Sequence, residues 1–235
     1  MLVAAAVCPA PPLLVPEVAA GAAAELDEAR TACSDALAVL AASRPDVLVV
    51  VGSAAPGQEG SYPQGSRGGF HGFGVDAEVR LGEGEEGPRP LPVSLAVGAW
   101  LLERARWGGA PVEGLAVAAP LEPEHCRGTG RELAAADERV ALLVMGDGSA
   151  CRTLKAPGYL DERAAGFDAA VARALGAADP GALAALDPVL ATELHAQGRA
   201  PWQVLAGAAE GANLGGRLLY EAAPYGVGYF VAVWS

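Results

Sequence analysis

Residues 46–52 read Asp-Val-Leu-Val-Val-Val-Gly, and this stretch is the clearest indication of the fold class. A short, continuously apolar run rich in valine is typical of a strand that is buried on both faces of a parallel sheet. Residues 2–7, 112–118 and 139–145 form similar apolar runs, which predict three further core strands.

Segments with helical patterns separate these runs. Helices are expected over 18–42, 93–106, the second half of 157–175 and 201–209, with further helix starts at Asp179-Pro180 and Asp187-Pro188. In both starts Asp is suited to the cap and Pro to the first helical position. Further strands are expected over 75–81 (an edge strand or hairpin arm), 216–220 and 226–234. Residues 56–74 are expected to form a long loop, and residues 120–130, within the polar stretch 120–138, are also expected to be a loop. The alternation predicts a single α/β domain over 1–235, with a central, mainly parallel sheet flanked by helices.

Composition and charge exclude several classes of protein. The 235 residues are 52% hydrophobic and only 19% charged, which excludes a disordered chain or a coiled coil. The formal net charge of −12 repels phosphate backbones and anionic lipid, so neither nucleic acid nor a membrane surface is an expected partner. No apolar stretch approaches the ~20 residues of a transmembrane helix. The four cysteines show no CxxC spacing, so we expect a cytoplasmic protein with reduced thiols.

The predicted sheet also indicates where a ligand site belongs. Ligands of open α/β sheets bind beyond the carboxyl ends of the strands. The segments that follow the core strands are residues 8–12, 52–56, 120–130 and 146–155.

Two kinds of catalytic site are possible from the residues alone. A non-haem iron site needs about two histidines and one carboxylate, and the chain has only His71, His125 and His195, with Glu124 beside the second. We interpret these histidines as polar surface or loop residues. Ser149 follows a core strand and Lys155 lies nearby, which leaves a metal-free hydrolase as an alternative, although the G-x-S-x-G motif is absent.

Five short stretches, spread over nearly the whole chain, match the motifs of one superfamily. They are Cys8-Pro9-Ala10-Pro11-Pro12, Val50-Val51-Gly52-Ser53-Ala54-Ala55, Gly146-Asp147-Gly148-Ser149-Ala150, Gln197-Gly198-Arg199-Ala200-Pro201 and Tyr225-Gly226-Val227-Gly228-Tyr229. The chain resembles the catalytic subunits of the class III extradiol ring-cleavage dioxygenases and the related Memo-like proteins, which commonly read P-H-P-P, V-I-G-P-N-H, S-D-L-S-H, C-G-R-x-P and V-G-Y in these places. The resemblance implies an α/β fold and a role in aromatic compound metabolism. It also implies Fe(II) held by two His and a carboxylate, with a further His as acid/base while dioxygen opens a catechol ring.

The chain departs from this pattern at the metal site. Ala10, Ala55 and Ala150 stand where the superfamily places histidines, and Gln197 stands where it places a metal-binding Glu or Cys. An alanine methyl group cannot donate a lone pair to a metal or carry a proton.

We therefore expect a degenerate homologue that needs no cofactor and acts as a small-molecule binder or as a partner subunit, with a homo-oligomer as one such assembly. The residues expected to line its cleft are Ala10, Ser53, Ala55, Asp147, Ser149, Ala150, Gln197 and Arg199. Candidates for catalysis are Asp147, Ser149, His125 and His195. The alternative is an Fe(II)-dependent enzyme that recruits His71, Glu124, His125 and His195.

Overall fold

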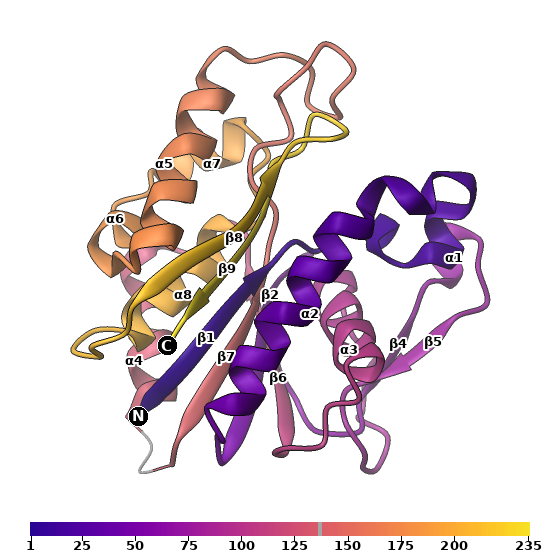
Figure 1. The fold of residues 1–235 in the computed structure, drawn as a ribbon, viewed down its shortest axis with the longest axis vertical. Helices are drawn as coiled ribbons and strands as arrows, with labels where there is room; N and C mark the ends of the chain where they lie inside the picture. The colour runs from indigo at the N-terminus through magenta and orange to yellow at the C-terminus, as the bar shows by residue number, and fades with distance from the viewer. Residues whose placement is uncertain (136–137) are drawn as a thin grey trace.

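In the residues that the computed structural model describes, 1–135 and 138–235, a seven-stranded sheet runs through the molecule in the order β3-β6-β2-β7-β1-β9-β8 (Figure 1). The strands are β1 (Leu2–Cys8), β2 (Val47–Ala54), β3 (Gly60–Tyr62), β6 (Val112–Ala118), β7 (Val140–Met145), β8 (Gly216–Ala222) and β9 (Tyr229–Trp234). The four central strands, β6, β2, β7 and β1, are parallel to one another. Strands β3, β9 and β8 extend the sheet by antiparallel pairing. The four predicted core strands and the mainly parallel α/β sheet are thus present.

Strand β2 shows why its sequence is continuously apolar. Leu48 and Val50 face one hydrophobic core, whereas Val49 and Val51 face a second core on the other side of the sheet. All four side chains are buried, and full burial of a Val or Leu side chain stabilises a fold by roughly 1.5–3 kcal/mol.

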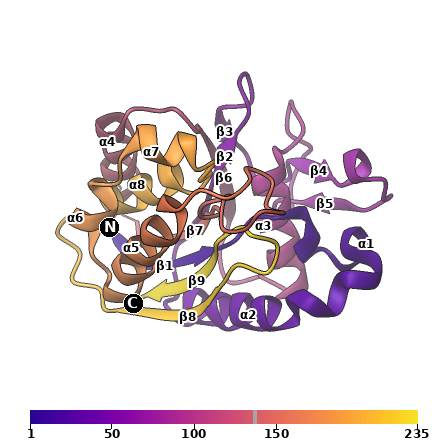
Figure 2. The same ribbon diagram turned by 90° about the horizontal axis from the view of Figure 1, so that it is seen from above.

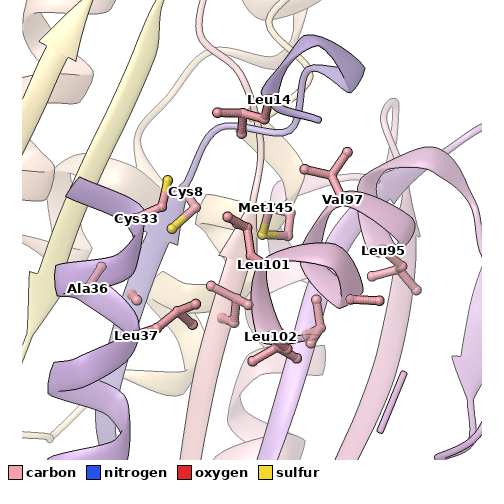
Figure 3. Packing of buried hydrophobic residues seen from close by; sticks show 14 of the residues in the cluster. Cys8, Leu14, Cys33, Ala36, Leu37, Leu95, Val97, Leu101, Leu102 and Met145 are labelled. Atoms are coloured by element: carbon pink, nitrogen blue, oxygen red, sulfur yellow. The ribbon is translucent and has the colours of Figure 1, made fainter. Parts of the chain in front are cut away.

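Two layers of helices cover the two faces of the sheet (Figure 2). The helices are α1 (Pro16–Ala19), α2 (Asp27–Ala42), α3 (Val93–Arg104), α4 (Pro123–Ala134), α5 (Arg163–Ala177), α6 (Pro180–Ala184), α7 (Pro188–Glu193) and α8 (Arg199–Ala208). Helices α2 and α3 pack on one face; Figure 3 shows Cys33 of α2 and Leu101 of α3 beside Cys8 and Met145 of the sheet. Helices α5 and α8 pack on the other face, and α4 packs against α8. None of the described helices is long and apolar enough to cross a membrane.

Two stretches that were expected to be loops contain regular structure, so that part of the prediction is wrong. Within 56–74 the chain forms β3, and β4 (Arg67–Gly69) pairs with β5 (Glu78–Arg80) in a small second sheet. Strands of three residues are too short to show an alternating pattern. Within 120–138 the chain forms α4, whose apolar side is small: Cys126 is buried, and Leu133 and Ala134 pack partly buried against the same core. The last part of that stretch, 136–137, lies outside the described residues.

Other element boundaries differ by a few residues. The helix expected over 18–42 is divided, because 3-10 turns occupy Ala20–Leu26 before α2 begins. The two Asp-Pro helix starts are confirmed. Asp179 accepts a hydrogen bond from the Ala182 amide, and Asp187 accepts hydrogen bonds from Val189 and Leu190.

Candidate functional site

A cleft of about 490 Å³ opens at the carboxyl ends of the parallel strands. Its lining comes from segments that follow β1, β2, β6 and β7, from the start of α3 and from the turn before α8. The lining residues are Ala10, Ser53, Ala54, Ala55, Pro56, Gln58, Pro92, Val93, Ser94, Ala119, Pro120, Gly146, Asp147 and Gln197.

Local backbone contacts hold the floor of this cleft together. The Gly146 amide donates a hydrogen bond to the Cys8 carbonyl, which joins the ends of the neighbouring strands β7 and β1. The Gly198 amide donates to the Asp147 carbonyl at 2.8 Å, which brings the turn before α8 against the end of β7. A side chain at position 146 would overlap the backbone of Gly198, so the close approach of the two segments requires glycine at 146.

Asp147 is the ionisable residue on the cleft floor. Its Oδ1 accepts a hydrogen bond of 2.8 Å from the Ala10 amide. Burial raises the pKa of the Asp147 carboxyl to about 7, and the hydrogen bond from Ala10 offsets only part of this increase. The side chain is half-buried because it faces the open cleft. The carboxyl therefore exchanges its proton near neutral pH.

Tyr229 of β9 lies within the electrostatic reach of this carboxyl. Burial, and secondarily the negative charge of Asp147, raises the pKa of the Tyr229 phenol well above its usual value. The phenol thus stays protonated at neutral pH.

Ser149 and Ala150 do not line the cleft, so these two predictions are wrong. Ser149 is fully buried, and its hydroxyl donates a hydrogen bond of 2.8 Å to Asp168 on α5. Asp168 also accepts hydrogen bonds from the Ser149 amide and from Arg152, so this group joins the loop after β7 to α5. Ala150 is buried and donates its amide hydrogen to the Leu194 carbonyl. The Ser149 hydroxyl is thus held by a carboxylate in the interior and has no histidine or lysine partner among its described hydrogen bonds.

Arg199 lies at the start of α8, beside the cleft and not in its lining. Its guanidinium donates hydrogen bonds to the carbonyls of Ala119 and Leu121 and to Oε1 of Gln203. Burial lowers the pKa of Arg199 from its usual value. The sequence motif predicts this residue in the lining of the cleft, and that prediction is wrong. The guanidinium bonds instead to the segment between β6 and α4, a contact that no local pattern reveals.

The three histidines lie on separate elements. His71 is exposed in a 3-10 turn and pairs with Asp76, His125 is exposed on α4, and His195 follows α7. Among the described residues, no group of three or more His, Cys, Asp or Glu side chains is placed to hold a metal ion. In the described lining of the cleft the polar side chains are Asp147, Gln197, Gln58 and two serines, so these residues do not fit an iron site of two histidines and a carboxylate.

Two polar side chains of the cleft are absent from the set predicted from the sequence. Gln58 lies two residues beyond the segment 52–56 that was predicted to follow β2, so a slightly longer segment would have included it. Ser94 comes from the first turn of α3, and its hydroxyl donates a 2.6 Å hydrogen bond to the Ser53 carbonyl. No local pattern indicates this second contact, because the two residues are 41 positions apart in the chain.

A larger hollow of about 820 Å³ lies elsewhere, near the start of β6. Arg80, Arg106 and Trp107 contribute to its lining together with Glu83 and Glu103. Its mixed charges and its distance from the carboxyl ends of the strands favour the smaller cleft as the functional site.

The fold of this chain recurs in another protein. No family model matches the chain, and no curated protein matches it. A solved structure, the uncharacterized protein JW3007 from Escherichia coli K12, is similar with a TM-score of 0.54 and 17% sequence identity, over 99% of each chain. A likeness at this level of identity shows a shared α/β fold over nearly all of both chains.

Proposed function

We propose that this protein binds a small organic molecule in the cleft around Asp147 and does not use iron to open aromatic rings. In this proposal it is a degenerate homologue of the extradiol dioxygenases. The observation that carries it is the lining of the cleft: Ala10 and Ala55 present methyl groups where metal-binding or proton-transferring side chains would be needed.

The cleft has the composition of a binding site. Most of its lining is Ala, Pro and Val, and a few polar side chains stand at its floor and rim. A ligand with a hydroxyl or amine group can donate a hydrogen bond to the Asp147 carboxylate. Because water is partly excluded there, such a bond is stronger than it would be on the surface.

The proposal places the protein in the cytoplasm. Cys8, Cys33, Cys126 and Cys151 are all buried free thiols, as expected of a protein that folds in a reducing compartment. The net charge of −12 makes a small molecule a better partner than nucleic acid.

Metal content is the first test. The protein is purified anaerobically, incubated with Fe(II) or Zn(II), desalted and analysed by mass spectrometry. We expect well under one metal ion per chain, because Asp147 alone cannot hold Fe(II) tightly. Metal close to one per chain, lost in a His125→Ala/His195→Ala double variant, would contradict the proposal and support the metalloenzyme.

A catechol assay completes the test. With Fe(II) and oxygen we expect no ring-opened product above the background of the buffer. Turnover at ordinary enzymatic rates, roughly 1 s⁻¹ or more, would overturn the proposal.

A further inference from the structure

A second, smaller cavity adjoins the cleft. It has a volume of about 320 Å³, and we call it the side cavity. Its lining residues are Ala119, Pro120, Ala191, Thr192, His195, Ala196, Gln197 and Arg199. Three of them, Ala119, Pro120 and Gln197, also line the cleft, so one molecule can extend from the cleft into the side cavity.

The lining of the side cavity has an unusual charge for this protein. It includes Arg199 and His195 and no Asp or Glu, although the chain has 28 acidic and 16 basic residues. Four other cavities of the described structure each include at least one carboxylate in their lining. The lining of the side cavity therefore offers hydrogen-bond donors to an anion and contains no carboxylate that would repel it.

Arg199 is the central group of this cavity. It is only 1% exposed, and the described ion pairs give it no carboxylate partner. Its acceptors are two backbone carbonyls, the Gln203 amide oxygen and, weakly, the Cys126 sulfur. The Nε–H group donates none of these bonds. The charge of Glu122 also acts on Arg199, but from beyond ion-pair distance. A buried cation whose direct acceptors are all neutral is incompletely compensated, so an anion beside it is stabilised.

His195 adds a donor at the mouth of the cavity. Its backbone has φ of 56°, a left-handed conformation that is uncommon for residues other than glycine. The Asp187 cap starts α7, and the His195 amide, which donates to the Thr192 carbonyl, follows the end of that helix. The fold thus holds an exposed imidazole and the Gln197 amide on the same wall as Arg199.

We infer that the side cavity binds the carboxylate of a small organic acid whose remaining part occupies the cleft beside Asp147. This inference rests on the proposed function and names the class of ligand. Arg199 supplies the positive charge, while His195 and Gln197 can donate hydrogen bonds to the carboxylate oxygens.

Benzoate and benzamide test the inference, because the two probes have nearly the same shape and only benzoate carries a charge. Binding is measured by calorimetry for the wild-type protein and two variants. Gln197→Glu places a negative charge in the side cavity at an exposed position, so the fold is preserved. Asn213→Asp is the matched control, since it adds the same charge at an exposed position beyond the other end of α8.

We expect benzoate to bind at least roughly tenfold more tightly than benzamide. We expect Gln197→Glu to weaken benzoate binding by roughly tenfold or more and Asn213→Asp to leave it unchanged. His195→Ala should weaken benzoate binding severalfold. Arg199→Lys is a poorer test, because Arg199 also holds the segment between β6 and α4.

Equal affinities for benzoate and benzamide, or no effect of Gln197→Glu, would overturn the inference. So would the absence of benzoate binding up to about 10 mM. Inorganic phosphate that binds in place of benzoate would assign the cavity to phosphate and overturn the carboxylate assignment. Metal loading separates the two proposals. If the protein holds no metal and binds neutral molecules through Asp147 but not carboxylates, the proposed function stands and only this inference is refuted.

Discussion

Asp147 is the residue whose chemistry depends most on its surroundings. Its carboxyl accepts the Ala10 amide hydrogen across 137 positions of sequence, and burial holds its pKa at about 7, compared with 3.8 for an unperturbed carboxyl. The folded state binds the proton more tightly than the unfolded state. This group therefore stabilises the fold fully below pH 3.8 and loses that contribution as the pH rises through about 7.

Asp147→Asn should remove this pH dependence. The full difference between the two pKa values corresponds to about 4 kcal/mol in the free energy of unfolding. We expect the wild type to lose only about 1–2 kcal/mol as the pH rises, because water reaches the carboxyl from the cleft. The amide oxygen can still accept the Ala10 hydrogen bond. Urea unfolding at pH 5 and pH 8 should show a smaller loss of stability for the variant than for the wild type. The exposed Asp35→Asn serves as the control, and equal losses in all three proteins would contradict the prediction.

At the scale of elements, α4 and α8 form the most extensive contact between helices in the described structure. A Cβ atom at Gly130 would overlap the Val204 carbonyl, and one at Gly207 would overlap the backbone of Arg127. The pair matters for the candidate site because Arg199 begins α8 and bonds to the segment that leads into α4.

Gly130→Ala and Gly207→Ala should each destabilise the protein by about 1–3 kcal/mol, because the helices must separate to admit a methyl group. Gly128→Ala, on the same helix as Gly130, has only the flexible end of Arg131 at 3.8 Å and should instead stabilise by about 0.5–1 kcal/mol. Thermal unfolding of the three variants measures the contrast. A loss at Gly128 as large as that at Gly130 would contradict the prediction, because it could not come from the contact with α8.

At the scale of the whole molecule, one sheet carries both hydrophobic cores. Each central strand places alternate side chains in both cores. Neither layer of helices can therefore unfold without exposing the sheet against which the other layer packs. This arrangement argues that residues 1–235 form one cooperative unit.

We therefore expect a single unfolding transition. Far-ultraviolet dichroism reports helices and strands. Tryptophan fluorescence reports Trp202 and Trp234 in one core and Trp100 and Trp107 beside the other, and the two signals should give coincident curves. The calorimetric and van't Hoff enthalpies should agree. Two separated transitions would contradict the single-domain prediction.

Local patterns in the chain were enough to predict the four central strands, the parallel α/β class, the position of the cleft and the Asp-Pro helix starts. Strands buried on both faces need continuous apolar runs, and the carboxyl ends of parallel strands meet at one edge. Long-range packing, in contrast, turns Ser149 inward to Asp168 and buries Arg199 in a cavity without a carboxylate. It also stabilises α4, since that helix has only a small apolar side and packs closely along α8. Such features depend on which element packs opposite a side chain, and that partner lies far away in the chain.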